Sequence, residues 1–292
     1  MFIYTIKGSK LSDSVLNTVS FAFRSEIQSK EVLMMNSQTE NENLERFYGG
    51  NPREMPLYSI PEAARHLKIP ARTLRRWVRG DNAENSKRRP TTPIIQLPDA
   101  ERPMLSFMNL VEAYVVSSIT RVEKVRFDKV RSTLNYFEKK SLSKYPLAST
   151  DLWTDGFNIF VETSGDVICA SLQGQQVIKE VISQYLRRID RDINLLPLRI
   201  YPFSRKMSFD ISDNHASENA TRVLELSPKN ISIDPLVSFG RPTLTGTGIA
   251  TNVIAGRFNA GESAKELAKD YDITEAQVGE AVSYEGSTRR AA

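Results

Sequence analysis

The chain has 292 residues, of which 40% are hydrophobic and 25% charged, and its formal net charge is +4 at pH 7. It contains no run of about 20 apolar residues, and its single cysteine, Cys169, cannot form an intramolecular disulfide. Composition therefore excludes a membrane-spanning protein and a disulfide-stabilised secreted domain. We expect a cytoplasmic, soluble protein with two or three compact units.

Residues 1–53 are expected to form a poorly ordered arm. They include the polar run NSQTENEN, end in GGNP and show no sustained hydrophobic period. The stretch SVLNTVSFAF is short and interrupted by polar residues, so it does not predict a secretory signal. Met34 and Met35 stand just before the polar run, which leaves open whether translation starts there or at Met1.

Two short helices joined by a tight turn are predicted from Tyr58 to Gly80. Ser59 and Glu62 match a capping box at the start of the first helix. Pro70 suits the start of the second helix, and Gly80 suits the left-handed conformation that closes one. The apolar positions of the two helices are Ile60, Ala63, Ala64, Leu67, Leu74, Trp77 and Val78.

Positive charge is concentrated in this segment and the loop that follows it. Tyr58 to Pro90 contains nine basic and three acidic residues, so its net charge is +6 and the rest of the chain sums to −2. Four arginines at i, i+3, i+4 and i+7 form one stripe on the second helix, opposite Leu74 and Val78. A solvated charged face is the alternative interpretation of such a stripe.

A helix with this stripe fits the major groove of B-form DNA. Arginine contacts phosphates there and can bond guanine O6 and N7. We therefore predict sequence-specific binding of operator DNA by the second helix and the basic loop after it. The predicted DNA-binding residues are Arg72, Thr73, Arg75, Arg76, Arg79, Lys87, Arg88 and Arg89.

A small β-hairpin, acting as a wing, is predicted after the basic loop. The runs IIQL and MLSF are separated by PDAERP, a typical turn composition. Helical spacing of apolar residues then continues from Ser106 to about Ser141 and predicts two amphipathic helices. The helices between Leu105 and Lys140 are the candidate homodimer interface.

The rest of the chain alternates strands and helices. FNIFVE and DVICAS are a candidate hairpin, Gln175 to Asp190 a helix, and LRIYPF an extended piece. From Ile231, short strands and glycine-rich turns precede helices with capping boxes at Ser263–Glu266 and Thr274–Gln277.

The predicted fold class is α+β, with a winged helix-turn-helix head, a mixed middle and a small C-terminal helical module preceded by short strands. The expected divisions are an arm (1–53), the head with its wing and following helices (54–141), the middle region (142–226), the C-terminal module (227–284) and a frayed tail (285–292).

The C-terminal module has the opposite charge balance from the head. Ile231 to Val282 contains four basic and seven acidic residues, a net charge of −3. The helices of the module resemble a second helix-turn-helix, so DNA binding is one alternative. DNA phosphates would repel a module with this charge. Protein contact is favoured over DNA contact, either self-association or binding of a basic partner.

The stretch YSIPEAARHLKIPARTLRRWVRG resembles the helix-turn-helix at the start of MerR-like regulators, with EAA in the first helix and P-x-x-T-L-R-x-W across the second. Together with LSFMNLVEAYVVSSI and the C-terminal IDPLVSFGRPTLTGTGI, it resembles VapB-type antitoxins whose C-terminal domain is of the domain-of-unknown-function 433 type. The resemblance covers about residues 48–284. Gly248 departs from the family pattern, which has arginine at that place.

This resemblance implies the antitoxin of a type II toxin–antitoxin pair, which binds a PIN-like ribonuclease toxin and represses its own operon. The candidate toxin-binding residues are Arg241, Pro242, Thr247 and Gly248. A stand-alone MerR-like regulator that responds to a small molecule is the alternative.

An enzyme is not expected, because no set of base, nucleophile and metal ligands is visible. His66 and His215 have no cluster of cysteines or carboxylates near them in the sequence, so no metal or cofactor is predicted. Cys169 is interpreted as a small core residue and the glycines of TGTG as a turn.

Overall fold

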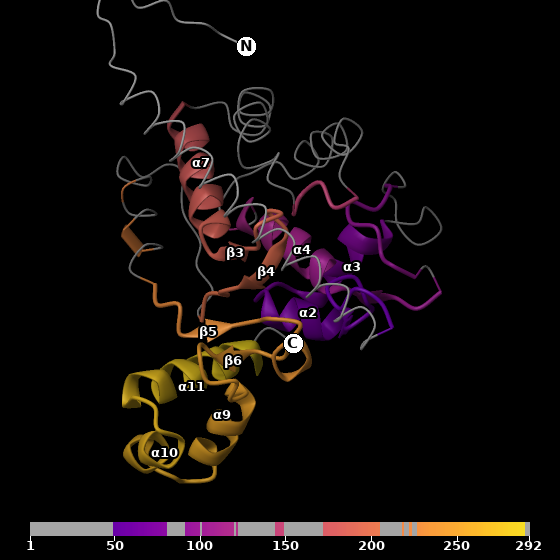
Figure 1. The fold of residues 1–292 in the computed structure, drawn as a ribbon. Coiled ribbons are helices and arrows are strands. Elements are labelled where there is room, and N and C mark those ends of the chain that lie inside the picture. Colours follow the sequence, from indigo (N-terminus) through magenta and orange to yellow (C-terminus); the bar gives the residue numbers. More distant parts are fainter. Residues whose placement is uncertain are drawn as a thin grey trace, which may run out of the picture. The chain divides into compact units, whose positions relative to one another are not determined.

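The described elements of the computed structural model are helices and short strands that pair as two-stranded antiparallel sheets, so the fold class is α+β, as predicted (Figure 1). The structure describes residues 49–80, 91–99, 101–119, 121, 144–148, 172–204, 218, 222–223 and 227–289. Several sequence predictions fall on other residues: the hairpin of residues 157–171, the helix expected after Val122, and the roles of Met34, Met35, Lys87, Arg88, Arg89, Cys169 and His215.

The two predicted helices of the head are confirmed. Strand β1 (Tyr58–Ser59) leads into α2 (Ile60–His66), and α3 (Ala71–Arg79) follows the turn. The Ser59 side chain caps α2 by accepting a hydrogen bond from the Glu62 backbone N–H at 3.3 Å. Pro70 is the N-cap of α3 rather than its first residue. The predicted apolar positions of both helices are buried.

The end of α3 is fixed by the segment that follows it. Gly80 closes the helix with φ of 72°. The backbone N–H groups of Ile94 and Ile95 both donate to the Trp77 carbonyl, at 2.7 and 3.1 Å. Both isoleucines are buried. The segment that begins at residue 91 thus packs against the C-terminal end of α3.

The prediction of a hairpin formed by IIQL and MLSF is wrong. Strand β2 (Met104–Leu105) pairs antiparallel with β1, so that Tyr58 lies opposite Leu105. The run at 94–97 forms no strand, because its first two backbone N–H groups bond to the end of α3. A two-stranded sheet does lie beside the two helices, but its strands come from the start of the head and from residue 104 onward.

Helix α4 (Phe107–Ile119) confirms the first helix predicted after the head. Each described side chain from Phe107 to Ser118 is buried, so α4 is a central helix rather than an amphipathic one. It packs against α7 (Leu172–Leu186) and the short strands β2 and β4 (Pro197–Ile200). Residues 107–118 therefore offer no exposed side chain for the predicted dimer contact.

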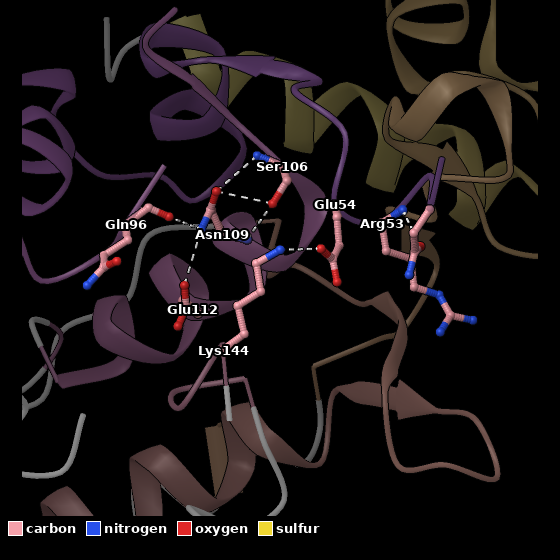
Figure 2. A network of polar contacts seen from close by, with 8 residues as sticks. Arg53, Glu54, Gln96, Ser106, Asn109, Glu112 and Lys144 are labelled. Atoms are coloured by element: carbon pink, nitrogen blue, oxygen red, sulfur yellow. Dashed lines mark hydrogen bonds and ion pairs between the residues drawn. The ribbon is translucent and has the colours of Figure 1, made fainter. Parts of the chain in front are cut away.

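Asn109 is the centre of a buried polar network at the start of α4 (Figure 2). Its amide nitrogen donates to the Gln96 carbonyl at 2.8 Å and to the Glu112 carboxylate at 3.3 Å. Its amide oxygen accepts from the backbone N–H of Ser106 at 3.2 Å and from the Ser106 hydroxyl at 3.1 Å. The network fastens the segment around Gln96, which also contacts α3, to the central helix.

Replacing Asn109 by alanine is expected to lower the free energy of unfolding by about 2–3 kcal/mol, since it leaves the buried backbone N–H of Ser106 without its acceptor and removes the bond to the Gln96 carbonyl. Urea denaturation followed by circular dichroism measures this. The exposed Asn252 is the matched control, and its alanine variant is expected to change stability by less than about 0.5 kcal/mol. Equal midpoints for the two variants would contradict the structural role of Asn109.

The predicted middle helix ends earlier than expected. Helix α7 stops at Leu186, and Ile189, predicted to lie inside the helix, begins strand β3 (Ile189–Arg191), which pairs with β4. The buried Arg188 fixes this change of direction, because its guanidinium donates to the carbonyls of Tyr201, Ser227 and Pro228. The extended conformation predicted for LRIYPF is confirmed at β4.

The residues just before Tyr58 also belong to the fold. Arg53, placed by the sequence in the arm, is buried, and its guanidinium lies 2.7 Å from the Asp192 carboxylate. The same carboxylate accepts from the backbone N–H groups of Asn194 and Leu196 in the β3–β4 turn. This ion pair joins the start of the head to the middle region.

The C-terminal module consists of short strands followed by helices, as predicted. Strand β5 (Ile231–Ser232) pairs with β6 (Thr243–Leu244), and the 3₁₀ turn η3 (Ser238–Gly240) lies between them. Helices α9 (Thr251–Asn259), α10 (Ala264–Tyr271) and α11 (Glu275–Arg289) follow and pack together (Figure 1). Their core consists of Ile231, Leu244, Ile254, Leu267, Val278, Ala281 and Tyr284.

Both capping boxes predicted in this module are present. The Ser263 hydroxyl accepts from the Glu266 backbone N–H, and the Glu266 carboxylate accepts from the Ser263 backbone N–H. Thr274 and Gln277 exchange the same pair of bonds before α11. Helix α11 continues to Arg289, five residues beyond the expected end of the module.

Candidate nucleic-acid interface

Helix α3 presents the arginine stripe that its sequence spacing predicts. Arg72, Arg75 and Arg79 are exposed, whereas Thr73 and Arg76 are partly buried. The opposite side of the helix is packed, with Leu74 and Trp77 at 0% and 1% exposure. The helix therefore has one apolar side that fixes it to the head and one cationic side that faces solvent.

Arg121 stabilises the turn between α2 and α3. The sequence patterns did not single out this residue. Arg121 is buried, and its guanidinium donates to the carbonyls of Leu67 and Lys68 at 2.6 and 3.2 Å. Its Nε donates to the hydroxyl of Tyr185 on α7 at 3.3 Å. The Arg121 side chain thus attaches this turn to the central part of the fold. The same turn sets the angle between α2 and α3.

Lys68 does not belong to the cationic surface, although the sequence counts it among the basic residues of the head. It is 3% exposed and adopts the left-handed conformation, with φ of 56°. Its Nζ donates to the Tyr284 carbonyl at 2.6 Å and lies 3.5 Å from the centroid of the Tyr284 ring. The head thereby contacts α11 of the C-terminal module.

His66, next to this contact, carries no charge at neutral pH. Burial, followed by the charges of Arg65 and Lys68, lowers the pKa of His66 to about 3. Its Nδ1 lies 3.4 Å from the Tyr284 hydroxyl. Arg65 is exposed on the same helix, so the described cationic surface consists of Arg65, Arg72, Arg75, Arg76 and Arg79.

The buried Lys68 makes the stability of the fold depend on pH. The pKa of Lys68 is lowered to about 7, mainly by burial. The charge of Glu285 opposes this shift, and the charges of Arg65 and Arg121 add to it. In the unfolded chain the pKa is near its usual value of 10.5. Between these two values the unfolded state binds the extra proton, so this group makes stability rise as pH increases from about 7 toward 10.

Replacing Lys68 by methionine removes this titration. We expect the stability difference between the original chain and Lys68→Met to shift in favour of the original chain between pH 7 and 9.5. Urea denaturation of both proteins across that range measures the difference, and all shared titrations cancel from it. A difference that stays constant with pH would contradict the assignment.

The second set of predicted site residues lies on two turns of the C-terminal module. Arg241, Thr247 and Gly248 are exposed, whereas Pro242 is buried and its carbonyl accepts from the Thr251 backbone N–H. The turns meet where the Ser238 hydroxyl donates to the Gly248 carbonyl at 2.9 Å. Three of the four predicted residues are thus exposed, on two turns that contact each other.

No group of three or more histidine, cysteine, aspartate or glutamate side chains suited to a metal ion occurs among the residues the structure describes. Within that same part of the chain, no helix is long and apolar enough to cross a bilayer.

Two family models match the chain in the regions just described. Residues 56–134 match a family described as "Putative DNA-binding HTH domain". Residues 231–284 match the family "Protein of unknown function (DUF433)". The first match covers the helix pair with its arginine stripe, and the second covers the C-terminal module.

The chain is also similar to proteins of Mycobacterium tuberculosis over most of its length. The chain is 29% identical over 246 residues to a protein named "Putative antitoxin VapB45", and the match covers 78% of this chain and 93% of that protein. The crystal structure of Rv2018 from the same organism is similar in fold, with a TM-score of 0.54 and 24% identity, over 78% of this chain and 98% of that one. The relation to MerR-like regulators stays a prediction.

Proposed function

We propose that the chain is the antitoxin of a type II toxin–antitoxin pair. In this role it binds DNA of its own operon through α3 and neutralises a PIN-like ribonuclease through its C-terminal module. The observation that carries the proposal is the division of the molecule between a cationic helix-turn-helix and a separate C-terminal module. The similarity to a protein named "Putative antitoxin VapB45" supports it.

The DNA-binding half of the proposal rests on α3. Its exposed arginines are spaced to face one groove, and the packed side holds the helix in a fixed orientation. Two heads in a homodimer would match a palindromic operator with half-sites about one turn of DNA apart. Repression follows from occupancy of a promoter that overlaps such an operator.

The protein-binding half rests on the exposed turns of the C-terminal module. The module carries a net negative charge and has no cluster of exposed cations comparable with α3 in its described residues. Surfaces of this kind suit a protein partner better than a nucleic acid. The arginine that the family pattern places at position 248 is absent, so Arg241 is the basic residue on this surface.

Co-expression with the product of the adjacent gene tests both halves together. We expect the two proteins to co-purify, the mixture to lack ribonuclease activity, and the chain to lower expression from a reporter that carries its own promoter. A toxic adjacent product whose activity is unaffected by the chain would contradict the antitoxin role. Release of the chain from promoter DNA by a small molecule alone would favour a stand-alone regulator instead.

A further inference from the structure

We propose that Phe239, on the turn η3, is the aromatic anchor with which the C-terminal module holds its protein partner. The inference rests on the proposed antitoxin function and names a contact residue that the sequence did not single out. Phe239 is 75% exposed, more than any other large hydrophobic residue in the part of the chain that the structure describes.

The backbone of this turn is strained at the residue that carries the exposed ring and at the residue before it. Ser238 and Phe239 are consecutive non-glycine residues in the left-handed region, with φ of 48° and 55°. Each such residue costs about 1–2 kcal/mol relative to the right-handed conformation. Left-handed non-glycine residues cluster at functional sites, where the surrounding structure over-determines them.

The surrounding structure does fix the turn, from several sides. The Ser238 hydroxyl donates to the Gly248 carbonyl, and the Tyr58 hydroxyl donates to the Gly240 carbonyl at 2.9 Å. Gly240 packs so closely on the head that a Cβ there would lie 2.3 Å from the Tyr58 hydroxyl. Phe239 is therefore an exposed ring on a preorganised support, and such a side chain binds a partner with little loss of conformational entropy.

Charge selects the kind of partner. Arg241 is the single charged residue between Pro235 and Gly256, whereas residues 257–285 contain three basic and seven acidic residues. One cation is too few to hold DNA, which rewards several phosphate contacts. Two copies meeting symmetrically through this surface would bring both Arg241 side chains together with no carboxylate from the same segment to neutralise them.

These observations define the occupant as a different protein that offers an apolar pocket for Phe239 and a carboxylate beside it for Arg241. Asp234 precedes this segment, but it is buried and its carboxylate lies 3.5 Å from the Arg199 guanidinium. The other acidic residues of the module lie after residue 256 and are not needed for this contact. The overall charge of the module predicted a basic partner. The contact at Phe239 and Arg241 instead requires a partner whose apolar pocket has an acidic rim.

The test compares Phe239→Ala and Phe239→Gly in the full chain, with the purified product of the adjacent gene as the probe. Leu195→Ala is the matched control, because Leu195 is also exposed (54%) and left-handed, with φ of 63°, but lies in the β3–β4 turn. Isothermal titration calorimetry measures the dissociation constant. Thermal unfolding and promoter binding verify that each variant is folded.

We expect both Phe239 variants to weaken partner binding at least tenfold and Leu195→Ala to change it less than twofold. Glycine accepts the left-handed backbone, so Phe239→Gly should retain the melting temperature while it loses the partner. Binding within twofold of the original chain in both Phe239 variants would overturn the inference and leave the antitoxin role intact.

Two further outcomes would also overturn it. If Phe239→Ala instead dissociates a homodimer of the chain, the ring is covered by a second copy. If the original chain does not bind the adjacent product at all, the proposed function fails first, and this inference fails with it.

Discussion

Replacing Arg72 and Arg75 together by alanine is expected to weaken binding to a DNA fragment with the chain's own promoter by about 100-fold at 0.1 M salt, because each contact contributes about 1–3 kcal/mol. Both side chains are exposed on α3, whereas Leu74 and Trp77 hold the helix to the head. The slope of log affinity against log salt concentration should fall by about 2 if both contact phosphates, since each such contact releases about 0.9 of a counterion.

Lys265 and Lys269 give the matched control. They are exposed on α10, and their replacement by alanine makes the same change in net charge. Promoter affinity of that variant should stay within about threefold of the original. Equal losses in the two double variants would mean that general electrostatic attraction, rather than α3, determines DNA binding. Fluorescence anisotropy over a salt series measures both quantities.

Replacing Gly80 by alanine is expected to destabilise the head by about 3 kcal/mol or more. Gly80 has φ of 72° and ψ of −173°, a region that only glycine populates readily. A Cβ at this position would also lie 1.9 Å from the Thr91 carbonyl oxygen, which is backbone and has little room to shift. The variant should therefore detach the segment around Ile94 and Ile95 from the end of α3, and DNA binding should be lost with it.

Two other glycines separate the backbone effect from the clash. Gly246 has φ of 81°, and a methyl group added there would meet no atom within 4 Å, so Gly246→Ala should cost only about 1 kcal/mol. Gly256 lies within α9, also in open space, and its alanine variant should gain up to about 1 kcal/mol. Urea denaturation of the three variants ranks them by free energy of unfolding. A loss of stability in Gly80→Ala no larger than that in Gly246→Ala would contradict the described packing.

Local features of the head were predictable because short-range chemistry determines them. Ser59 lies at the start of one helix and Gly80 at the end of the next, and each residue type has a strong preference for that place. Pro70 lies one residue before the first helical position, which is the position that proline prefers. The arginine stripe follows from helical spacing once the buried Leu74 and Trp77 fix which side faces inward. The capping boxes of the C-terminal module were found in the same way.

Long-range features were not predictable from these patterns. The run IIQL has strand composition, but its partner is the end of α3, a choice made by tertiary contacts. The apolar spacing of α4 suggested one buried side, whereas neighbouring elements cover every described side chain. Lys68 gives no local signal of burial, because its Nζ is bonded to Tyr284, 216 residues further along the chain.

The candidate protein-binding surface was predicted only in part. The resemblance pointed to Arg241, Thr247 and Gly248, which are exposed, but also to Pro242, which is buried. Phe239 was missed because one aromatic residue in a sequence is more often a core residue, and its exposure depends on two left-handed residues that sequence patterns do not reveal. The structure was needed to place it beside the other turn.

Hydrogen exchange of the full chain, measured with the promoter fragment alone and with the adjacent gene product alone, distinguishes the DNA-binding surface from the protein-binding surface. We expect DNA to protect residues 71–80 and leave residues 238–248 unchanged, and the protein partner to protect residues 238–248. Protection of residues 238–248 by DNA, with α3 exchanging as in the free chain, would contradict this expectation.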